Sequence, residues 1–271
     1  MTPLFIPSKD RFNNSILLSS LQKTNINHYI VVEPQDSKNY IKYYPKSNIV
    51  VLPENNKGIS YVRQYILDYA NKKKMNWIWM IDDDILPTIS VINKNNKLNK
   101  ISLYKSLEKA ITHSFKKGFP SAHKINVNDH KDKIAQIGFK HIVWLREYSK
   151  YNINCQVVCN QISAINIPLI KKHKIKYFSK LNFREDIDLT CQIVDSGLLT
   201  VRFNNYGYDC NHKRNYNNTK THKNGGMSKV FNSMNWVKQG QILKKRFNKY
   251  IIINNGKFKL NLNSSKKRFY K

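Results

Sequence analysis

The first ninety residues alternate between short apolar segments typical of strands and amphipathic segments typical of helices. Strand patterns lie at residues 4–7, 28–34, 48–53 and 77–81, and helix patterns lie at 14–22 and 58–70. Such an alternation predicts an α/β domain whose central sheet is mostly parallel and has helices on both faces.

Polar residues follow each of these strands. SKDR comes after the first strand, Glu33 and a proline end the second, PENN follows the third, and Asp82–Asp84 follow the fourth. In open α/β sheets, ligands bind beyond the carboxyl ends of the strands. We therefore expect these four segments to meet at one edge of the sheet and to form a ligand site there.

The three aspartates end a wholly apolar run, WIWMI. Because side chains alternate along a strand, Asp82 and Asp84 are expected to face one side and Asp83 the other. Two carboxylates that point into one crevice repel each other unless a cation lies near them, and hard oxygen ligands favour Mg²⁺ or Mn²⁺. The alternative is that one aspartate only caps a following turn or helix.

The second half of the chain is less regular. After a polar stretch at 90–100, the pattern predicts a helix at 102–118, a loop at 119–134, strands at 136–145 and 155–167, a helix at 183–197 and a strand at 198–203.

A second acidic group, Glu185, Asp186 and Asp188, opens the helix predicted at 183–197. These carboxylates either stabilise the helix dipole, by about 0.3–1 kcal/mol each, or supply a general base. A metal site followed by a carboxylate matches sugar transfer from a nucleotide donor, in which a metal neutralises the leaving diphosphate and a base deprotonates the acceptor hydroxyl.

The charge of the chain is strongly positive, with 47 basic and 17 acidic residues and a formal net charge of +30. This surplus predicts a polyanionic partner such as nucleic acid. A genome rich in A/T codons would explain the preference for lysine over arginine, but it does not explain the scarcity of Asp and Glu. The four cysteines form no CxxC pair, and no apolar run has transmembrane length, so we expect a cytoplasmic protein without integral membrane association.

Taken together, IPSKDR, VVEP, GISYVRQYILDYA before WIWMIDDD, and FREDIDL resemble the glycosyltransferases of the GT-A fold over roughly residues 3–205. More narrowly, WIWMIDDDI, REDIDL and a C-terminal GG pair are similar to the TET-associated glycosyltransferases. The resemblance implies a GT-A type, Rossmann-like fold and a nucleotide-sugar donor, which we expect to be a UDP-sugar. It also implies that the acceptor is a hydroxymethylated pyrimidine in phage DNA, and hence that the enzyme works in the host cytoplasm.

The domain organisation that this resemblance implies is a catalytic domain at 1–205 and a basic C-terminal segment at 206–271 that packs on it. Within the catalytic domain, the nucleotide-sugar half covers about 1–90 and the acceptor half about 135–205. Basic segments at 116–133, 211–223 and 244–271 are expected to hold the DNA backbone.

The resemblance also assigns donor-site roles. Pro7, Ser8 and Arg11 are expected to line the nucleoside pocket, and Glu33 to lie near the base or ribose. Arg63 is expected to approach the diphosphate or to hold the aspartate loop, and it is otherwise an ordinary helix arginine. Asp83 is grouped with these nucleotide-sugar-binding residues.

For the metal, Mn²⁺ or Mg²⁺, the resemblance implies Asp82 and Asp84 as ligands, with Asp82 also able to reach the ribose. His212 is the expected further ligand, and His222 is its reserve. The catalytic base is expected to be Asp186, with Glu185 as its neighbour.

Three other functions remain open on the sequence. The same enzyme could modify a surface polysaccharide or lipooligosaccharide, with its basic tail on anionic lipids. The aspartates could instead hold a metal for nucleotidyl transfer, although the flanking strands offer no further carboxylate for such a site. A DNA-binding protein without catalysis would have no use for three aspartates that face a polyanion.

Overall fold

The computed structural model describes residues 2–119, 124–181, 183–210, 236–254 and 257–270. Ten strands form one sheet: β1 (Leu4–Pro7), β2 (His28–Val32), β3 (Ile49–Val51), β4 (Trp77–Ile81), β5 (Ile85–Ile92), β6 (Leu98–Ser102), β7 (Ile134–His141), β8 (Ile153–Cys155), β9 (Ile162–Asn166) and β10 (Leu199–Cys210). The helices that flank this sheet are α1 (Ile16–Leu21), α2 (Pro34–Tyr43), α3 (Ile59–Lys72), α4 (Leu103–Glu108), α5 (Ser114–Lys117), α6 (Ile167–Lys172) and α7 (Glu185–Asp195).

Short helical turns connect several of these elements: η1 (Lys46–Asn48), the π-helix η2 (Lys109–His113), η3 (Val127–Lys133) and η4 (Ile142–Trp144). The C-terminal part contains α10 (Trp236–Arg246), the hairpin of β11 (Ile251–Asn254) and β12 (Lys257–Leu260), α11 (Asn263–Lys266) and η5 (Lys267–Phe269).

The sheet has the order β3-β2-β1-β4-β9-β7-β10-β5-β6, with β8 paired to β10. Strands β3, β2, β1 and β4 are all parallel, as the alternation in the first ninety residues predicts. Strand β9 is antiparallel to both β4 and β7, and β7 is parallel to β10. It follows that β4 and β7 run in the same direction and end at the same edge of the sheet.

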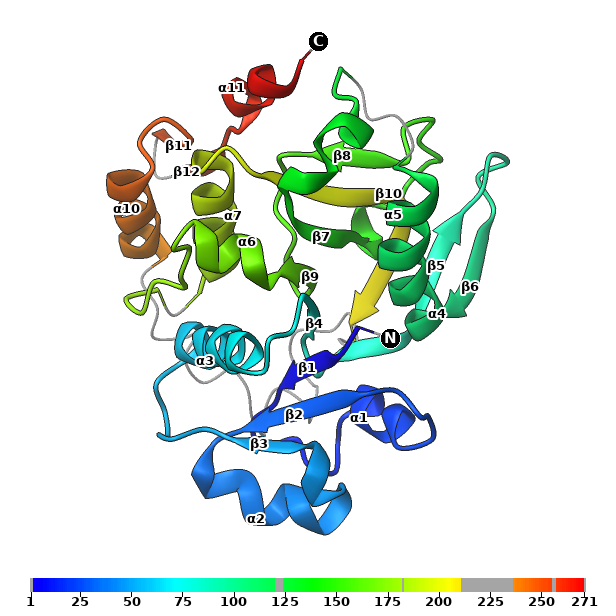
Figure 1. The fold of residues 1–271 in the computed structure, drawn as a ribbon, viewed down its shortest axis with the longest axis vertical. Coiled ribbons are helices and arrows are strands. Elements are labelled where there is room, and N and C mark those ends of the chain that lie inside the picture. The colour runs from blue at the N-terminus through cyan, green and yellow to red at the C-terminus, as the bar shows by residue number, and fades with distance from the viewer. Residues whose placement is uncertain (1, 120–123, 182, 211–235, 255–256, 271) are drawn as a thin grey trace.

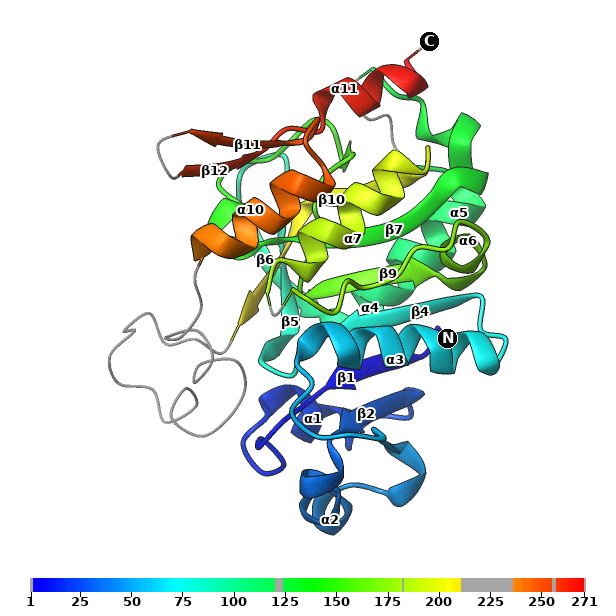
Figure 2. The ribbon, with the colours of Figure 1, turned by 90° about the vertical axis from the view of Figure 1, so that its left-hand side faces the viewer.

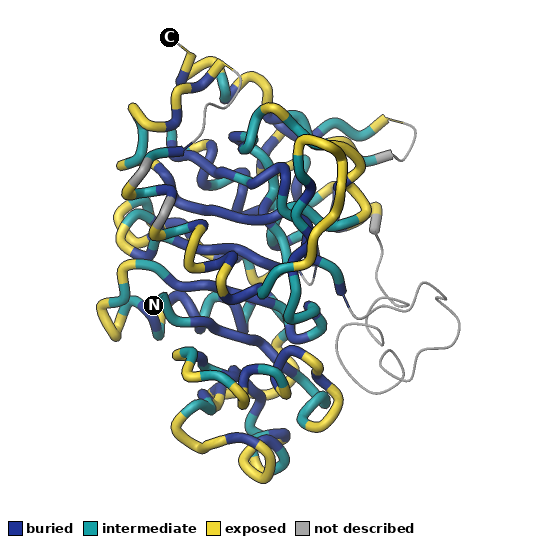
Figure 3. The backbone as a smooth tube through the Cα atoms, turned by 90° about the vertical axis from the view of Figure 1, so that its right-hand side faces the viewer, coloured by how far each residue is buried: buried dark blue, intermediate teal, exposed yellow. Residues whose placement is uncertain are grey.

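Helices cover both faces of the sheet, and the predicted α/β class is therefore confirmed (Figure 1). One core contains Leu17 and Leu18 of α1 with Leu107 of α4, and the other contains Ile66 of α3 with Leu189 of α7. The strands between these two cores are the most deeply buried part of the backbone (Figure 3).

The fold differs from the sequence prediction in several places. The strand predicted at 136–145 ends at His141, and the strand predicted at 155–167 is interrupted at residues 156–161, between β8 and β9. The polar stretch at 90–100 belongs to the hairpin of β5 and β6, which extends the sheet by antiparallel pairing of β5 with β10. The segment after Glu33 forms α2, although its buried side chains are only Asp36 and Tyr40. Neither the hairpin nor α2 has a continuous apolar stripe in its sequence, so contacts with distant parts of the chain determine the structure of each segment.

The C-terminal elements pack on α7 (Figure 2). Leu243 of α10 and Phe247, the residue that follows this helix, share a core with Cys191 and Val194 of α7. Across the same contact, Arg246 Nε donates to Asp188 Oδ1 over 2.7 Å, and the Asp188 side chain is fully buried.

This ion pair leads to a first prediction about stability. Replacing Arg246 with alanine leaves the buried Asp188 carboxylate without its cation, so we expect the free energy of unfolding to fall by about 3 kcal/mol. Lys249→Ala is a matched control on the same contact, because Lys249 pairs with Asp195 where both side chains are exposed and such pairs contribute about 0–1 kcal/mol. Urea unfolding of both variants measures the difference, and equal losses would contradict the role given to Arg246.

Candidate active site

The polar segments that follow β1, β2, β3 and β4 meet at one edge of the sheet, which we call the rim. Lys9 Nζ lies 2.8 Å from Glu33 Oε2, and the backbone nitrogen of Asn56, in the segment after β3, donates to Glu33 Oε1 over 2.9 Å. Ser8 Oγ donates to Asp83 Oδ2 over 2.5 Å, which joins the end of β1 to the aspartates after β4. The predicted convergence of these four segments is confirmed.

The aspartates form a turn and do not continue the strand. Strand β4 ends at Ile81, and the backbone nitrogen of Ile85 donates to the carbonyl oxygen of Asp82 over 3.3 Å. The prediction that Asp83 faces away from Asp84 is wrong, because Arg11 Nη1 pairs with Asp83 and also lies 3.7 Å from Asp84 Oδ2. The alternation that holds in a strand ends where the chain turns into β5.

Asp83 is buried, and its polar atoms bond to neighbouring residues of the protein. Besides Ser8 and Arg11, it is linked to α1, because Ser15 Oγ donates to its carbonyl oxygen over 2.6 Å. Burial raises the pKa of Asp83 to about 6, against the opposing effect of Arg11. These contacts fix the turn to β1 and α1, so Ser8 and Arg11, expected in the nucleoside pocket, are both bonded to Asp83.

Tyr40 of α2 is a member of this cluster that the sequence does not reveal. Its hydroxyl lies 2.7 Å from Ser8 Oγ and accepts from the backbone nitrogen of Arg11 over 3.1 Å. Burial raises the pKa of Tyr40, so the phenol stays neutral. The remaining nucleoside-pocket residue, Pro7, is the buried last residue of β1 and pairs with Val31.

Arg63 connects the two acidic motifs. It lies on the buried face of α3, which begins after Gly58, a residue whose φ of 84° lies in the left-handed region that glycine adopts readily. Its guanidinium contacts Asp82 Oδ1 through Nη2 and Glu185 Oε1 through Nη1, each at 2.8 Å. Residues more than a hundred positions apart are thus brought to the same point of the rim.

The start of α7 supplies the other two carboxylates. Burial, aided by repulsion from Asp186, raises the pKa of Glu185 to about 7, although Arg63 opposes the shift. Burial also raises the pKa of Asp186, whose carboxylate accepts from the backbone nitrogen of Ile187 over 2.8 Å. Glu185 is occupied by Arg63, whereas Asp186 is partly exposed at the same edge.

On the other side of the aspartate turn, β9 and β10 bring further polar groups to the rim. The backbone nitrogen of Asp82 donates to the carbonyl oxygen of Gln161 over 2.9 Å, and Gln161 Oε1 lies 3.5 Å from Cys210 Sγ. His141 Nε2, at the end of β7, lies 3.8 Å from the same sulfur. These three side chains have no motif that would mark them in the sequence.

The carboxylates of the aspartate turn are candidate ligands for a metal ion. In the parts of the chain that the structure describes, no group of three or more His, Cys, Asp or Glu side chains is arranged to hold a cation. Asp82 and Asp84 nevertheless lie close enough for Asp82 to add to the effect of burial that raises the pKa of Asp84 to about 6. Two mutually repelling carboxylates fit Mg²⁺ or Mn²⁺, because these ions complete their coordination with water and substrate phosphates.

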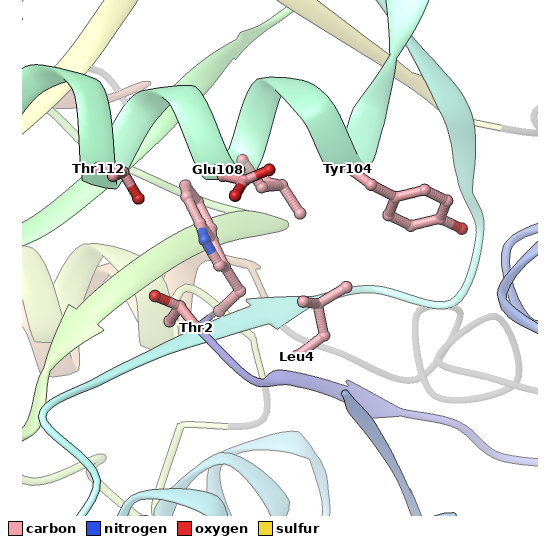
Figure 4. Close-up of a pocket in the computed structure, with 7 residues that line it drawn as sticks. Thr2, Leu4, Tyr104, Glu108 and Thr112 are labelled. Atoms are coloured by element: carbon pink, nitrogen blue, oxygen red, sulfur yellow. The ribbon is translucent and has the colours of Figure 1, made fainter. Parts of the chain in front are cut away.

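Two other features bear on the position of the site. The pocket in Figure 4 is lined by Thr2, Leu4 and Glu108, among others, at the start of β1 and along α4, and it contains no residue of the rim. His212, His222, the GG pair and the basic segment at 211–223 lie outside the described residues. No helix among the described residues has the length and apolar character needed to span a bilayer.

Comparison with known proteins adds to this geometry. The model of the family described as TET-Associated Glycosyltransferase matches residues 2–219. No curated protein matches the sequence.

Among solved structures, S. aureus TarS 1-349 in complex with UDP-GlcNAc has a TM-score of 0.50 and 14% identity over 97% of this chain and 97% of that one. GalNAc-T7 with UDP, GalNAc and Mn²⁺ has a TM-score of 0.48 and 11% identity over 92% of this chain and 50% of that one. At this level of identity, the likeness to TarS concerns the fold.

Proposed function

Since this chain belongs to the TET-associated glycosyltransferase family, we propose that it transfers a sugar from a nucleotide-sugar donor to the hydroxymethyl group of a modified pyrimidine in DNA. The charge of +30 supports a polyanionic acceptor. Asp209 is the last acidic residue of the chain, and many lysines and arginines follow it.

The observation that carries the proposal is the bridge made by Arg63. A transferase of this kind needs a donor site and an acceptor-activating carboxylate at one place, and Arg63 joins Asp82 of the first to Glu185 beside the second. A binding protein would have no need to bring the two acidic motifs together at the cost of burying them.

For the donor, we assign the nucleoside to the end of β1 and to Glu33, and the diphosphate to the aspartate turn. Asp82 and Asp84 would hold Mn²⁺ or Mg²⁺, which when bound offsets the charge of the leaving diphosphate. Ser8, Arg11 and Asp83 hold this turn in place through their mutual contacts. TarS was solved with UDP-GlcNAc, which makes a UDP-sugar the first donor to test.

For the activation of the acceptor, we assign the role of general base to Asp186. It takes the proton of the hydroxymethyl group as that oxygen forms its bond to the anomeric carbon and the bond from this carbon to the diphosphate breaks. Glu185 is already paired with Arg63, and its role is to fix the start of α7. Burial raises the pKa of Asp186, which makes it a stronger base than an ordinary aspartate.

These pKa shifts predict how transfer depends on pH. A raised pKa means that the proton stays on the carboxyl up to a higher pH, and both Asp84, with a pKa of about 6, and Asp186 must be ionised to act. We therefore expect kcat/KM to fall at least about tenfold per pH unit below pH 6, because protonation of either carboxylate stops transfer. Mn²⁺ affinity should also fall as Asp84 becomes protonated. Rates and calorimetric metal titrations between pH 5 and 8 test this, and a flat profile down to pH 5 would contradict it.

The proposed function is tested by incubating the enzyme with Mn²⁺, a panel of UDP-sugars, and either ordinary DNA or DNA carrying 5-hydroxymethyl pyrimidines. Mass spectrometry of the digested nucleosides is expected to show a sugar added to the hydroxymethylated base alone. Donor hydrolysis without any transfer to DNA would overturn the DNA acceptor and favour a surface polysaccharide.

A further inference from the structure

The short turn η4 presents two large apolar side chains to solvent. Val143 is 52% exposed and Trp144 is 63% exposed, the highest value among the exposed large hydrophobic side chains of the described residues. A single exposed apolar residue is common on protein surfaces, but two adjacent ones that include a tryptophan are typical of a contact surface.

The turn is rigidly mounted. The side chain of Leu145, next to Trp144, is buried against β10, where Gly207 leaves room for it. A Cβ atom at Gly207 would lie 2.8 Å from Leu145 Cδ2 and 3.3 Å from Ile142 Cα. The backbone nitrogen of Leu145 also donates to the carbonyl oxygen of Ile142 over 2.9 Å. The backbone that carries Trp144 is therefore held in place, which limits the conformational entropy lost when a partner binds.

The turn η4 lies at the rim, on the side of the aspartate turn opposite to β1. Strand β7, which η4 follows, runs in the same direction as β4 and ends at the same edge. A chain of contacts leads from His141, the last residue of β7, to the aspartate turn. His141 approaches Cys210, Cys210 approaches Gln161, and the carbonyl of Gln161 accepts from the backbone nitrogen of Asp82.

The surroundings of Trp144 are basic and aromatic. Arg146 and Lys150 are exposed, and Lys150 Nζ lies 5.2 Å from the centre of the Tyr151 ring. Glu147 is the one acidic residue between β7 and β8. Positive side chains that track a phosphate backbone, together with an aromatic ring on which bases stack, are what a nucleic-acid strand requires.

We propose that Trp144, with Val143 beside it, stacks on a base next to the target pyrimidine of a DNA acceptor, while Arg146 and Lys150 contact the adjacent phosphates. This inference rests on the proposed function and identifies the surface that holds its acceptor. A base beside the target that is held on Trp144 leaves the target free to leave the base stack and to present its hydroxymethyl group at the rim.

The experiment compares Trp144→Ala and Trp144→Phe with the wild-type enzyme. We expect Trp144→Ala to raise both the Kd and the KM for a hydroxymethylated DNA duplex about tenfold. Trp144→Phe, which keeps a ring, should stay within about twofold of wild type. Donor hydrolysis without DNA should be unchanged in both, because Trp144 has no part in the donor site. Tyr43→Ala is the matched control, since Tyr43 is an exposed aromatic at the end of α2.

Two results would overturn the inference. The first is a Trp144→Ala enzyme that binds DNA and vesicles of anionic lipid as tightly as wild type, which would show that this surface contacts neither. The second is a Trp144→Ala enzyme that loses affinity for the vesicles but not for DNA, which would assign the surface to a membrane. If the wild-type enzyme transfers no sugar to DNA, the proposed function fails, and the DNA affinities of the two Trp144 variants still decide whether this surface contacts nucleic acid.

Discussion

Asp84→Ala is expected to lower sugar transfer by about 1000-fold or more while leaving the fold intact. The variant loses one of the two carboxylates assigned to the metal, and a bound metal contributes several kcal/mol to stabilising the charge of the leaving group. The fold should tolerate the change, because burial and repulsion from Asp82 already raise the pKa of Asp84 and disfavour its charged form. Arg11 keeps its pair with Asp83.

The neighbouring Asp83→Ala variant is the matched control for this prediction. Asp83 accepts from Ser8 and pairs with the largely buried Arg11, so its loss is expected to cost about 3 kcal/mol of unfolding free energy. The two variants should therefore separate, with Asp84→Ala stable but inactive and Asp83→Ala measurably destabilised. Thermal unfolding, Mn²⁺ titration and transfer assays are made on both variants. An active Asp84→Ala enzyme would show that the aspartate turn is not the metal site.

Arg63→Met is expected to have the largest effect on stability. The guanidinium is buried and lies within 2.8 Å of both Asp82 and Glu185. Without it, two carboxylates face each other with no buried cation, which is expected to cost about 3–5 kcal/mol. Arg63→Lys keeps the charge but has a single ammonium in place of a planar fork, so it should recover only part of the stability and little of the activity.

A double variant separates the structural role of Arg63 from its role in the reaction. Arg63→Met combined with Glu185→Gln removes one of the two unpaired carboxylates, so a large part of the lost unfolding free energy should return. Transfer should not return, because the start of α7 is no longer tied to the aspartate turn. A single Arg63→Met variant as stable as wild type would show that this bridge is not formed.

Much of the fold could be predicted from the sequence because its signals are local. The apolar run WIWMI forms β4 over the predicted residues, and the pattern around Leu107 forms the helical segment from α4 to α5. The hairpin of β5 and β6 was not predicted, because β6 has a largely exposed side chain at each of its first three positions. Its structure depends on pairing with β10, a strand more than a hundred residues away.

The candidate site could be predicted only in part, for a related reason. Strand ends indicate which residues reach the rim, and they placed Ser8, Glu33 and the aspartates there correctly. Strand ends do not indicate which of these residues bond to each other. The pairing of Asp83 with Arg11, and that of Arg63 with both acidic motifs, depend on the side-chain geometry of packed helices. The roles of these residues in the reaction stay predictions.

The most direct test of the central claim, that the rim is the donor site, is to locate the metal and the nucleotide. Crystals grown with Mn²⁺ and UDP would be measured at the manganese absorption edge. We expect one anomalous peak in contact with Asp84 and the diphosphate, with the uridine beside Glu33 and the end of β1. A manganese peak and nucleotide bound away from the aspartate turn would contradict this account of the site.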